Sequence, residues 1–191
     1  MQEYDEALRE QTEKTEIVFQ GPIFRVEVAE VRLPNGKTAR RDVVRHPGAV
    51  CVLPVTKEGE VYLVRQWRAG YRGVTLEIPA GKLDPGETDT REAAARELRE
   101  ETGAVAGRMT SLGDYYGSPA ILEERIAMYL AEDLTFGETD FDEDEFLAPV
   151  RMPLDDLVRE VLAGHIPDGK TQVAALRAYC MRHGLPGDAA R

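Results

Sequence analysis

The chain has 191 residues, a net charge of −11, 42% hydrophobic residues and 31% charged residues. This length suits one domain with a small additional piece, and the composition is typical of a water-soluble protein with a sizeable core. The negative charge argues against nucleic acid and anionic membranes as partners, because both require basic surfaces. An acidic, polar N-terminus and the lack of an apolar run of about 20 residues predict neither a signal peptide nor a membrane span.

The two cysteines, Cys51 and Cys180, lie far apart and lack the spacing of metal ligands. We expect both to be buried thiols in a reducing compartment, so a cytoplasmic location is predicted.

Strand signals begin after a polar N-terminal segment. Residues 1–15 are expected to form a short helix or a frayed tail. The segment IVFQGPIFRVEVAEVRLPNGKTARRDVVRH predicts two or three strands, because part of it alternates with period two and Pro-Asn-Gly at 34–36 favours a hairpin turn. We therefore predict a strand-rich arm over 1–45 and a main domain over 46–191.

The main domain is predicted to start with a buried strand, AVCVLPV, because the segment is short, apolar and rich in valine. After the turn KEGE, the segment VYLVRQWR is expected to pair with it, and TLEIPAG to form a short strand before a loop. Trp67 alternates with Arg68, so it is expected to face the core or a subunit interface.

Further along the chain, helices and strands alternate. A helix capped by Thr88, Asp89 or Thr90 should end at Gly103, a residue type that tolerates the left-handed stop. Two strands, an acidic loop (FGETDFDEDEF), a helix started by Pro153 and a last helix closed by Gly184 follow. The pattern predicts the α/β or α+β class, with a mixed sheet covered by helices.

The helix that ends at Gly103 carries Glu97, Glu100 and Glu101 in its last two turns. The helix macrodipole disfavours carboxylates there by a few tenths to about 1 kcal/mol each. Glu97 and Glu101 project within about 40° of each other, next to the apolar side. Half-withdrawn acids repel one another unless a cation joins them, and hard oxygen ligands suit Mg²⁺ or Mn²⁺. Alternatively, neighbouring arginines pair with the acids on a solvated face.

The strings GKLDPGE (81–87) and RELREETGA (96–104) together resemble the box of the Nudix hydrolases, G-x5-E-x7-R-E-U-x-E-E-x-G-U, where U is apolar. One departure is that eight residues, instead of seven, separate Glu87 from Arg96. The resemblance implies a β-α-β sandwich and hydrolysis of a nucleoside diphosphate derivative.

The resemblance also implies roles for the residues of the box. Arg96 would orient the glutamates, and Glu87 would be a secondary ligand or a structural acid. The implied metal ligands are the Ala80 carbonyl, Glu97, Glu101 and, directly or through water, Glu100.

VRQWRAGY, LEIPAGKLDPGE, SP and DEDEF resemble the ADP-ribose pyrophosphatase subfamily. That likeness implies Mg²⁺-dependent cleavage of ADP-ribose to AMP and ribose 5-phosphate, with two or three cations in each active site. Ser118 and Pro119 would border the terminal sugar, although Ala120 replaces the usual glycine. Alternatives are the hydrolysis of another nucleotide sugar (GDP-mannose or ADP-glucose) and a regulator that binds ADP-ribose without cleaving it.

Hydrolysis also needs a base, and the acidic loop offers candidates. By resemblance, Glu143 would be the base, and Glu145 a metal contact or the alternative base. A solubilising loop is the other interpretation of this acidic run.

Substrate contacts are implied for both predicted regions. Arg41 and Arg68 would bind the diphosphate and ribose, since arginine binds phosphate in a bidentate manner. Ile23 and Phe24 are candidates for stacking on adenine, with core packing as their alternative role. In relatives the N-terminal strands exchange across a two-fold axis, so a homodimer is expected.

Overall fold

A computed structural model describes residues 6–139 and 146–184, and the chain divides into two compact units. The first unit comprises residues 1–48 and 116–124, and the second comprises residues 49–115 and 125–191. No helix in the described part of the chain is long and apolar enough to cross a membrane.

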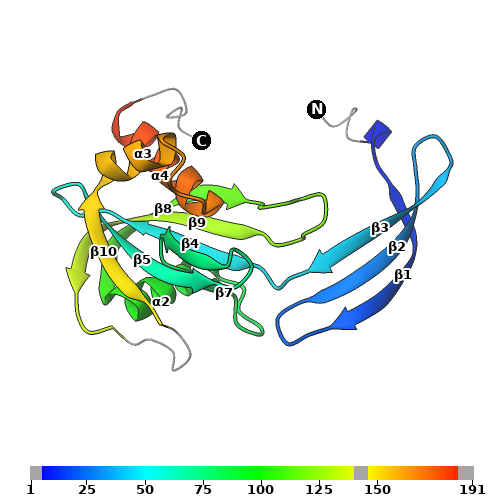
Figure 1. The fold of residues 1–191 in the computed structure, drawn as a ribbon, viewed down its shortest axis with the longest axis horizontal. Helices are drawn as coiled ribbons and strands as arrows, with labels where there is room; N and C mark the ends of the chain where they lie inside the picture. The colour runs from blue at the N-terminus through cyan, green and yellow to red at the C-terminus, as the bar shows by residue number, and fades with distance from the viewer. Residues whose placement is uncertain (1–5, 140–145, 185–191) are drawn as a thin grey trace. The chain divides into compact units, whose positions relative to one another are not determined.

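The strands are β1 (Gln11–Gln20), β2 (Arg25–Arg32), β3 (Thr38–Arg45), β4 (Ala49–Pro54), β5 (Glu60–Arg68), β6 (Gly73–Glu77), β7 (Ala80–Lys82), β8 (Ala104–Tyr115), β9 (Ile126–Phe136) and β10 (Ala148–Pro153) (Figure 1). The helices are α2 (Thr90–Thr102), α3 (Leu154–Leu162) and α4 (Gly169–Arg182).

The first unit is built on an antiparallel sheet in the order β1-β2-β3. The predicted turn between β2 and β3 is confirmed, and Gly36 adopts φ 80°, a left-handed conformation that glycine tolerates. The segment 116–124 joins β3 through Val44, whose N–H donates to the Ile121 carbonyl at 2.7 Å.

The expected helix or tail extended too far: residues 6 and 7 are helical, but β1 already begins at Gln11, so the prediction was wrong for residues 11–15. Residues 11–15 are polar and give no apolar alternation, but their backbone pairs with the far end of β2, with Gln11 opposite Arg32. Every residue of β1 is exposed, including the apolar Ile17, Val18 and Phe19. The pairing of backbone groups, more than apolar burial, therefore defines this strand.

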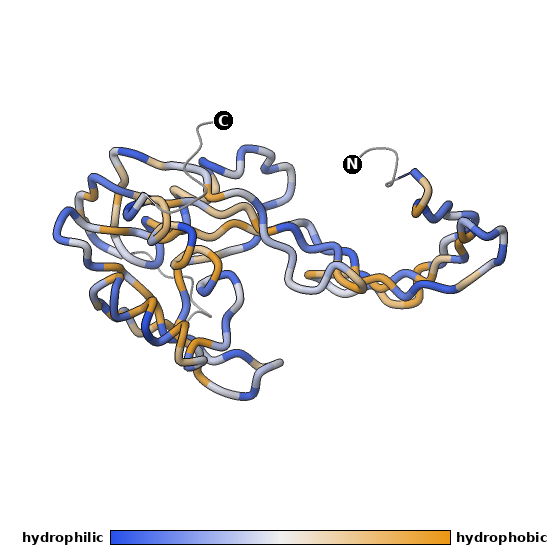
Figure 2. Tube along the Cα trace, turned by 90° about the horizontal axis from the view of Figure 1, so that it is seen from above, coloured by the Kyte–Doolittle hydropathy of each residue, from blue (hydrophilic) through white to orange (hydrophobic). Residues whose placement is uncertain are grey.

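The second unit contains two sheets. One is mixed, in the order β7-β4-β9-β8 with β4 parallel to β9, and the other is antiparallel, in the order β10-β5-β6. The predicted mixed α/β architecture is confirmed. In Figure 2 the hydrophobic segments of this unit follow the central strands, and the turns are mostly hydrophilic.

Strand β4 is buried on both faces and separates two apolar clusters. Val50 and Val52 pack in the cluster of α2, together with Leu98. Cys51 and Leu53 point to the opposite cluster, which contains side chains of β5, α3 and α4. The helix α2 is therefore fixed to one face of the mixed sheet, and this contact sets the position of its acids.

One predicted strand pairing and one predicted strand were wrong. VYLVRQWR was expected to pair with AVCVLPV, but β4 pairs with β7 and β9, and only the bridge Val55–Val61 links it to the region of β5. TLEIPAG was expected to be one strand, but it is divided between β6 and β7, which belong to different sheets. Pro54 and Pro79 lie at these two changes of sheet, and proline has no N–H to extend a ladder.

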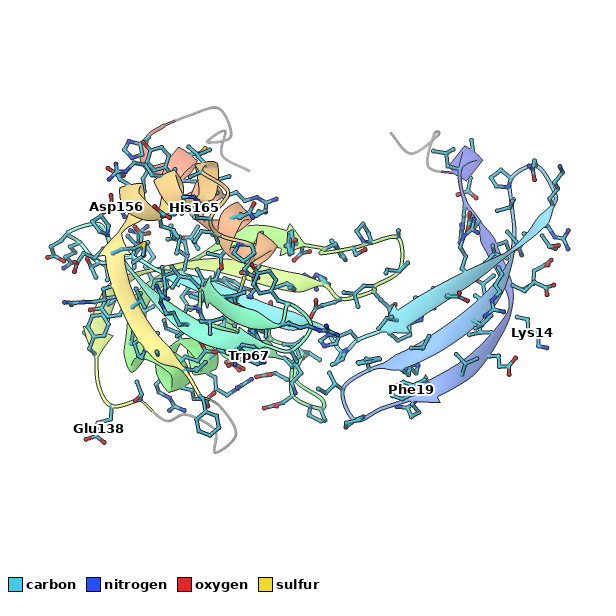
Figure 3. The ribbon with its side chains drawn as sticks, in the orientation of Figure 1. Lys14, Phe19, Trp67, Glu138, Asp156 and His165 are labelled. Atoms are coloured by element: carbon cyan, nitrogen blue, oxygen red, sulfur yellow. The ribbon has the colours of Figure 1, made fainter. Side chains whose placement is uncertain are left out.

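Trp67 lies outside the core, contrary to one of its two expected positions. The exposed fraction of Trp67 is 62%. Figure 3 labels this residue of β5 in the lower part of the second unit. It lies opposite Val74 on β6, which is also exposed. The alternative expectation for Trp67, a subunit interface, stays a prediction.

Both cysteines are free thiols, as expected. Cys51 is fully buried, and burial raises the pKa of its thiol to about 12. It is therefore a packing residue without a reactive thiolate. Cys180 is only partly buried, so the expectation of a buried thiol was wrong at this position.

Candidate active site

The helix α2 begins and ends with well-formed caps. The Asp89 carboxylate accepts hydrogen bonds from the N–H groups of Arg91 and Glu92, and Gly103 closes the helix at φ 70°. One of the three predicted N-caps and the predicted stop are therefore confirmed. The helix is continuous from Thr90 to Thr102, so the extra residue of the box lies in the loop before it.

That loop still brings Glu87 to the helix. The Asp84 N–H donates to the Glu87 carboxylate at 3.0 Å, and Arg96 Nη2 donates to the same carboxylate at 3.2 Å. Glu87 is thus a partner of Arg96 despite the longer spacing, and the loop absorbs the additional residue.

Arg96 is the cation at the centre of the box. Its Nη1 donates to Glu97 Oε1 at 2.8 Å and to Glu100 Oε2 at 3.0 Å. Burial opposes the charge, but attraction from Glu97 and hydrogen bonds to Glu87 and Glu100 raise the pKa of Arg96 above its ordinary value. One guanidinium therefore holds three of the four box glutamates.

The other side of α2 faces β7. Glu97 and Glu101 are only 8% and 3% exposed, and the Ala80 N–H approaches Glu101 Oε1 at 3.4 Å. A Cβ on Gly81 would lie 2.0 Å from Glu97 Oε1, so only glycine leaves room for this carboxylate. The strand and the helix thus enclose two carboxylates beside a backbone segment.

The donor chemistry of this region fits a divalent cation. Carboxylate oxygens are the ligands that Mg²⁺ and Mn²⁺ prefer, and two of these carboxylates are buried. Within residues 6–139 and 146–184, however, no group of three or more His, Cys, Asp or Glu side chains is already arranged around one ion position. Glu97 and Glu100 instead hold Arg96.

Sequence reasoning missed a second charged cluster around Glu77, at the end of β6. Glu77 is 2% exposed and accepts hydrogen bonds from Arg68 Nε at 2.8 Å and Nη2 at 2.7 Å. Its other donors are Thr75 Oγ1 and Lys170 Nζ. Burial raises the pKa of this carboxyl, but the hydrogen bonds from Arg68 and the charge of Lys170 outweigh burial and lower it to about 2.

Lys170 joins this cluster from the first turn of α4. Its Nζ also donates to Asp168 Oδ1 at 2.9 Å, and the side chain is 10% exposed. A signal was present in the sequence, because the macrodipole disfavours a cation in the first turn of a helix. The same reasoning that singled out the acids of α2 could have singled out Lys170.

The Glu77 cluster lies within electrostatic range of the box. Hydrogen bonds to Glu77 are the main cause of a raised pKa at Arg68, and the charge of Glu101 contributes in the same direction. The charge of Glu101 in the box thus helps to stabilise the guanidinium of Arg68, one of the predicted substrate residues.

The other predicted substrate residues belong to the first unit, whereas the box and Arg68 belong to the second. Arg41 Nε donates to Glu10 at 2.9 Å. Ile23 and Phe24 are 47% and 40% exposed, so core packing, their alternative role, was wrong.

Ser118 and Pro119 lie in the segment 116–124 of the first unit, where the Ser118 carbonyl accepts from two backbone N–H groups. Glu143 and Glu145, the candidate base and metal contact, lie outside the described residues.

The fold and the box define a class of domains in which an acidic helix follows a strand and loop on a mixed sheet. The family model described as the NUDIX domain matches residues 44–177, so the chain belongs to the Nudix family. Residues 10–44 match the nucleoside diphosphate sugar hydrolase N-terminal domain.

Relatives and a solved structure resemble nearly the whole chain. An ADP-ribose pyrophosphatase of Bacillus subtilis is 41% identical over 170 residues, covering 88% of this chain and 91% of the relative. A methanol dehydrogenase activator of Bacillus methanolicus is 41% identical over 167 residues, covering 86% and 90%. A crystal structure of an ADP compounds hydrolase aligns with a TM-score of 0.79 at 26% identity, covering 92% of this chain and 95% of that one.

The depressed pKa of Glu77 predicts a specific loss of stability in acid. A carboxyl that titrates near 4.5 when unfolded and near 2 when folded stabilises the protein fully above pH 4.5. That stabilisation, about 3 kcal/mol, should be lost as the pH falls from 4.5 towards 2. Between pH 6 and pH 3, the free energy of unfolding measured in urea should therefore fall more steeply for the wild type than for Glu77→Gln.

A carbon NMR titration of the Glu77 carboxyl measures the same property directly. A midpoint above pH 4, or equal pH slopes for the two proteins, would contradict the assignment.

Proposed function

We propose that the protein hydrolyses the diphosphate of ADP-ribose with water, giving AMP and ribose 5-phosphate. The observation that carries the proposal is that α2 holds two buried box carboxylates, Glu97 and Glu101, against β7. Arg68, whose partly exposed guanidinium is fixed by Glu77, supplies a donor for phosphate. Such a site combines ligands for a cation with a donor for phosphate. The choice of ADP-ribose as the substrate is supported by the relative named ADP-ribose pyrophosphatase. The match covers 91% of that relative.

A divalent cation, Mg²⁺ or Mn²⁺, belongs to this proposal, with two or three ions in each active site. Its ligands would be the Ala80 carbonyl, Glu97, Glu100, Glu101 and Glu145. When bound, it would offset the charge of the diphosphate and make water more acidic. The hard oxygens of the buried carboxylates support this assignment.

Arg96 orients the glutamates in this proposal, and its hydrogen bonds to Glu97 and Glu100 support that role. Glu143 is assigned as the base that takes the proton of the attacking water, with Glu145 as the alternative base. Arg68 contacts the diphosphate.

Five residues of the first unit are also proposed as substrate contacts. Arg41 binds ribose or phosphate, Ile23 and Phe24 stack on adenine, and Ser118 and Pro119 border the terminal sugar. The exposure of Ile23 and Phe24 supports a binding role for both side chains.

Catalysis is favoured over a purely regulatory role by the acids of the box. Two relatives of equal identity bear different names, a pyrophosphatase and an activator, so identity does not separate the two roles. A protein that only binds its ligand does not need the four acids Glu87, Glu97, Glu100 and Glu101, and this chain has all of them.

A substrate panel tests the activity. We expect release of nucleoside monophosphate with Mg²⁺, a higher kcat/KM for ADP-ribose than for ADP-glucose or GDP-mannose, and no release with EDTA. A higher kcat/KM for GDP-mannose would show that GDP-mannose, and not ADP-ribose, is the preferred substrate. No turnover of any of the three compounds would remove the enzymatic proposal.

Gly81→Ala tests the role of the strand that faces Glu97. The new Cβ would displace the end of a flexible side chain, so stability should fall by only about 1 kcal/mol. The carboxylate would leave its position, and kcat/KM should fall by about 100-fold, or roughly 3 kcal/mol. The measurements are urea unfolding and steady-state kinetics.

Gly70→Ala is the matched control, because a Cβ at Gly70 meets no atom within 4 Å. Its activity and stability should stay near those of the wild type. Normal activity in Gly81→Ala would mean that the position of Glu97 does not matter for the reaction.

We also propose a homodimer with exchanged N-terminal strands, in the cytoplasm. The exposed Ile17, Val18 and Phe19 on β1 support a partner for this edge strand, and the two free thiols suit a reducing compartment. Light scattering should give about twice the 21.3 kDa of one chain. A fully active monomer would refute the exchange of N-terminal strands. Cell fractionation, with the protein expected in the cytoplasmic fraction, tests the proposed location.

A further inference from the structure

The N-cap and the first three residues of α4 each make a defined contact. Asp168 caps the helix by accepting from the Thr171 N–H at 2.9 Å. A Cβ on Gly169 would lie 2.1 Å from Tyr115 Oη, so the Tyr115 side chain would have to shift if this residue were not glycine. Lys170 reaches Glu77, and Thr171 Oγ1 accepts from the Ile78 N–H at 2.9 Å. Through Lys170 and Thr171, the start of α4 thus holds Glu77 at the end of β6 and Ile78 in the segment that leads to β7.

We propose that Lys170 and Glu77 are positioning residues, which fix the guanidinium of Arg68 for binding the substrate diphosphate. This inference rests on the proposed function, because it assigns a task to Arg68 in that reaction. Neither Lys170 nor Glu77 is part of the Nudix box, and the mechanism proposed above uses neither of them.

The geometry at Arg68 supports this role. Glu77 binds Nε and Nη2 in parallel, and two such bonds fix the plane of a guanidinium as well as its position. Within the described part of the chain, no hydrogen bond uses Nη1 of Arg68. The Arg68 side chain is 42% exposed, whereas Glu77 is 2% exposed. The buried carboxylate therefore anchors one edge of the guanidinium and leaves another edge for a ligand.

Lys170 adds to the effect of Arg68 in keeping this anchor ionised. Glu77 is buried, and burial alone would favour its neutral form, which cannot hold a bidentate ion pair. Two cations, Arg68 and Lys170, balance the two anions Glu77 and Asp168. Loss of Lys170 would leave one excess negative charge beside Arg68, where the proposal places the anionic diphosphate.

A role in helix stability alone does not explain Lys170. A cation in the first turn of a helix is disfavoured by the macrodipole, and burial of its ammonium carries a further desolvation penalty. The position is therefore stabilised only by the partners that the fold brings to it, Glu77 and Asp168.

The test measures ADP-ribose binding in EDTA by isothermal titration calorimetry, and KM and kcat with Mg²⁺. Lys170→Met keeps the length of the side chain and removes its charge. We expect about a tenfold increase in Kd and KM, with kcat changed less than threefold. Lys170→Arg, which keeps the charge, should restore Kd to within threefold of the wild type.

Arg177→Met is the matched control. Arg177 is also a long cationic side chain on α4, but its Nη1 donates to the Leu112 carbonyl, away from Glu77. This variant should lose stability and keep the Kd of the wild type within twofold. A structural role of Lys170 would make the two variants alike.

A double-mutant cycle separates positioning of Arg68 from a general effect of charge. In the Arg68→Ala background, Lys170→Met should change Kd less than twofold, because the residue that it positions is gone. A tenfold effect that persists in this background overturns the proposal, and so does an unchanged Kd in Lys170→Met alone.

If Lys170→Met does not fold, Thr75→Val carries the test, because it removes another donor to Glu77 at nearly constant volume. A threefold rise in Kd is then expected, and an unchanged Kd overturns the proposal. A wild type that neither binds nor cleaves ADP-ribose would instead refute the proposed function.

Discussion

Carboxylates that are withdrawn from water need a positive charge in contact, and this requirement shapes both parts of the candidate site. Arg96 of α2 holds Glu97 and Glu100 of the same helix and Glu87 of the preceding loop, so acids that would repel one another remain close together. At the end of β6, Arg68 and Lys170 do the same for Glu77. Removing one partner of such a buried pair leaves an uncompensated charge, which is strongly destabilising. The two clusters are therefore both structural and electrostatic features of the site.

Both clusters place charges where a helix by itself disfavours them. Glu100 and Glu101 lie near the carboxyl end of α2, and Lys170 lies in the first turn of α4. The macrodipole costs are small, of the order of 1 kcal/mol or less for each exposed charge. Contacts made by the fold can exceed them, so a misplaced charge is a useful sign that a side chain serves a site.

Much of the fold could be predicted from the sequence, where the signal is local. The limits of α2 follow from an N-cap at Asp89 and a left-handed stop at Gly103. The buried strand β4 follows from its run of apolar residues. Within α2, the contact of Arg96 with Glu100 is a neighbour relation at i and i+4, so the helix period alone brings them together.

The sequence by itself determined most of the elements, the stop of α2 at Gly103 and the acidic face of that helix, because these depend on residues a few positions apart. Only the tertiary structure decided that β4 pairs with β9 and that β6 and β7 belong to different sheets. It alone joined Lys170 to Glu77, which is 93 residues away. The free energy of such a contact depends on burial and on neighbouring charges, and both exist only after the chain has folded.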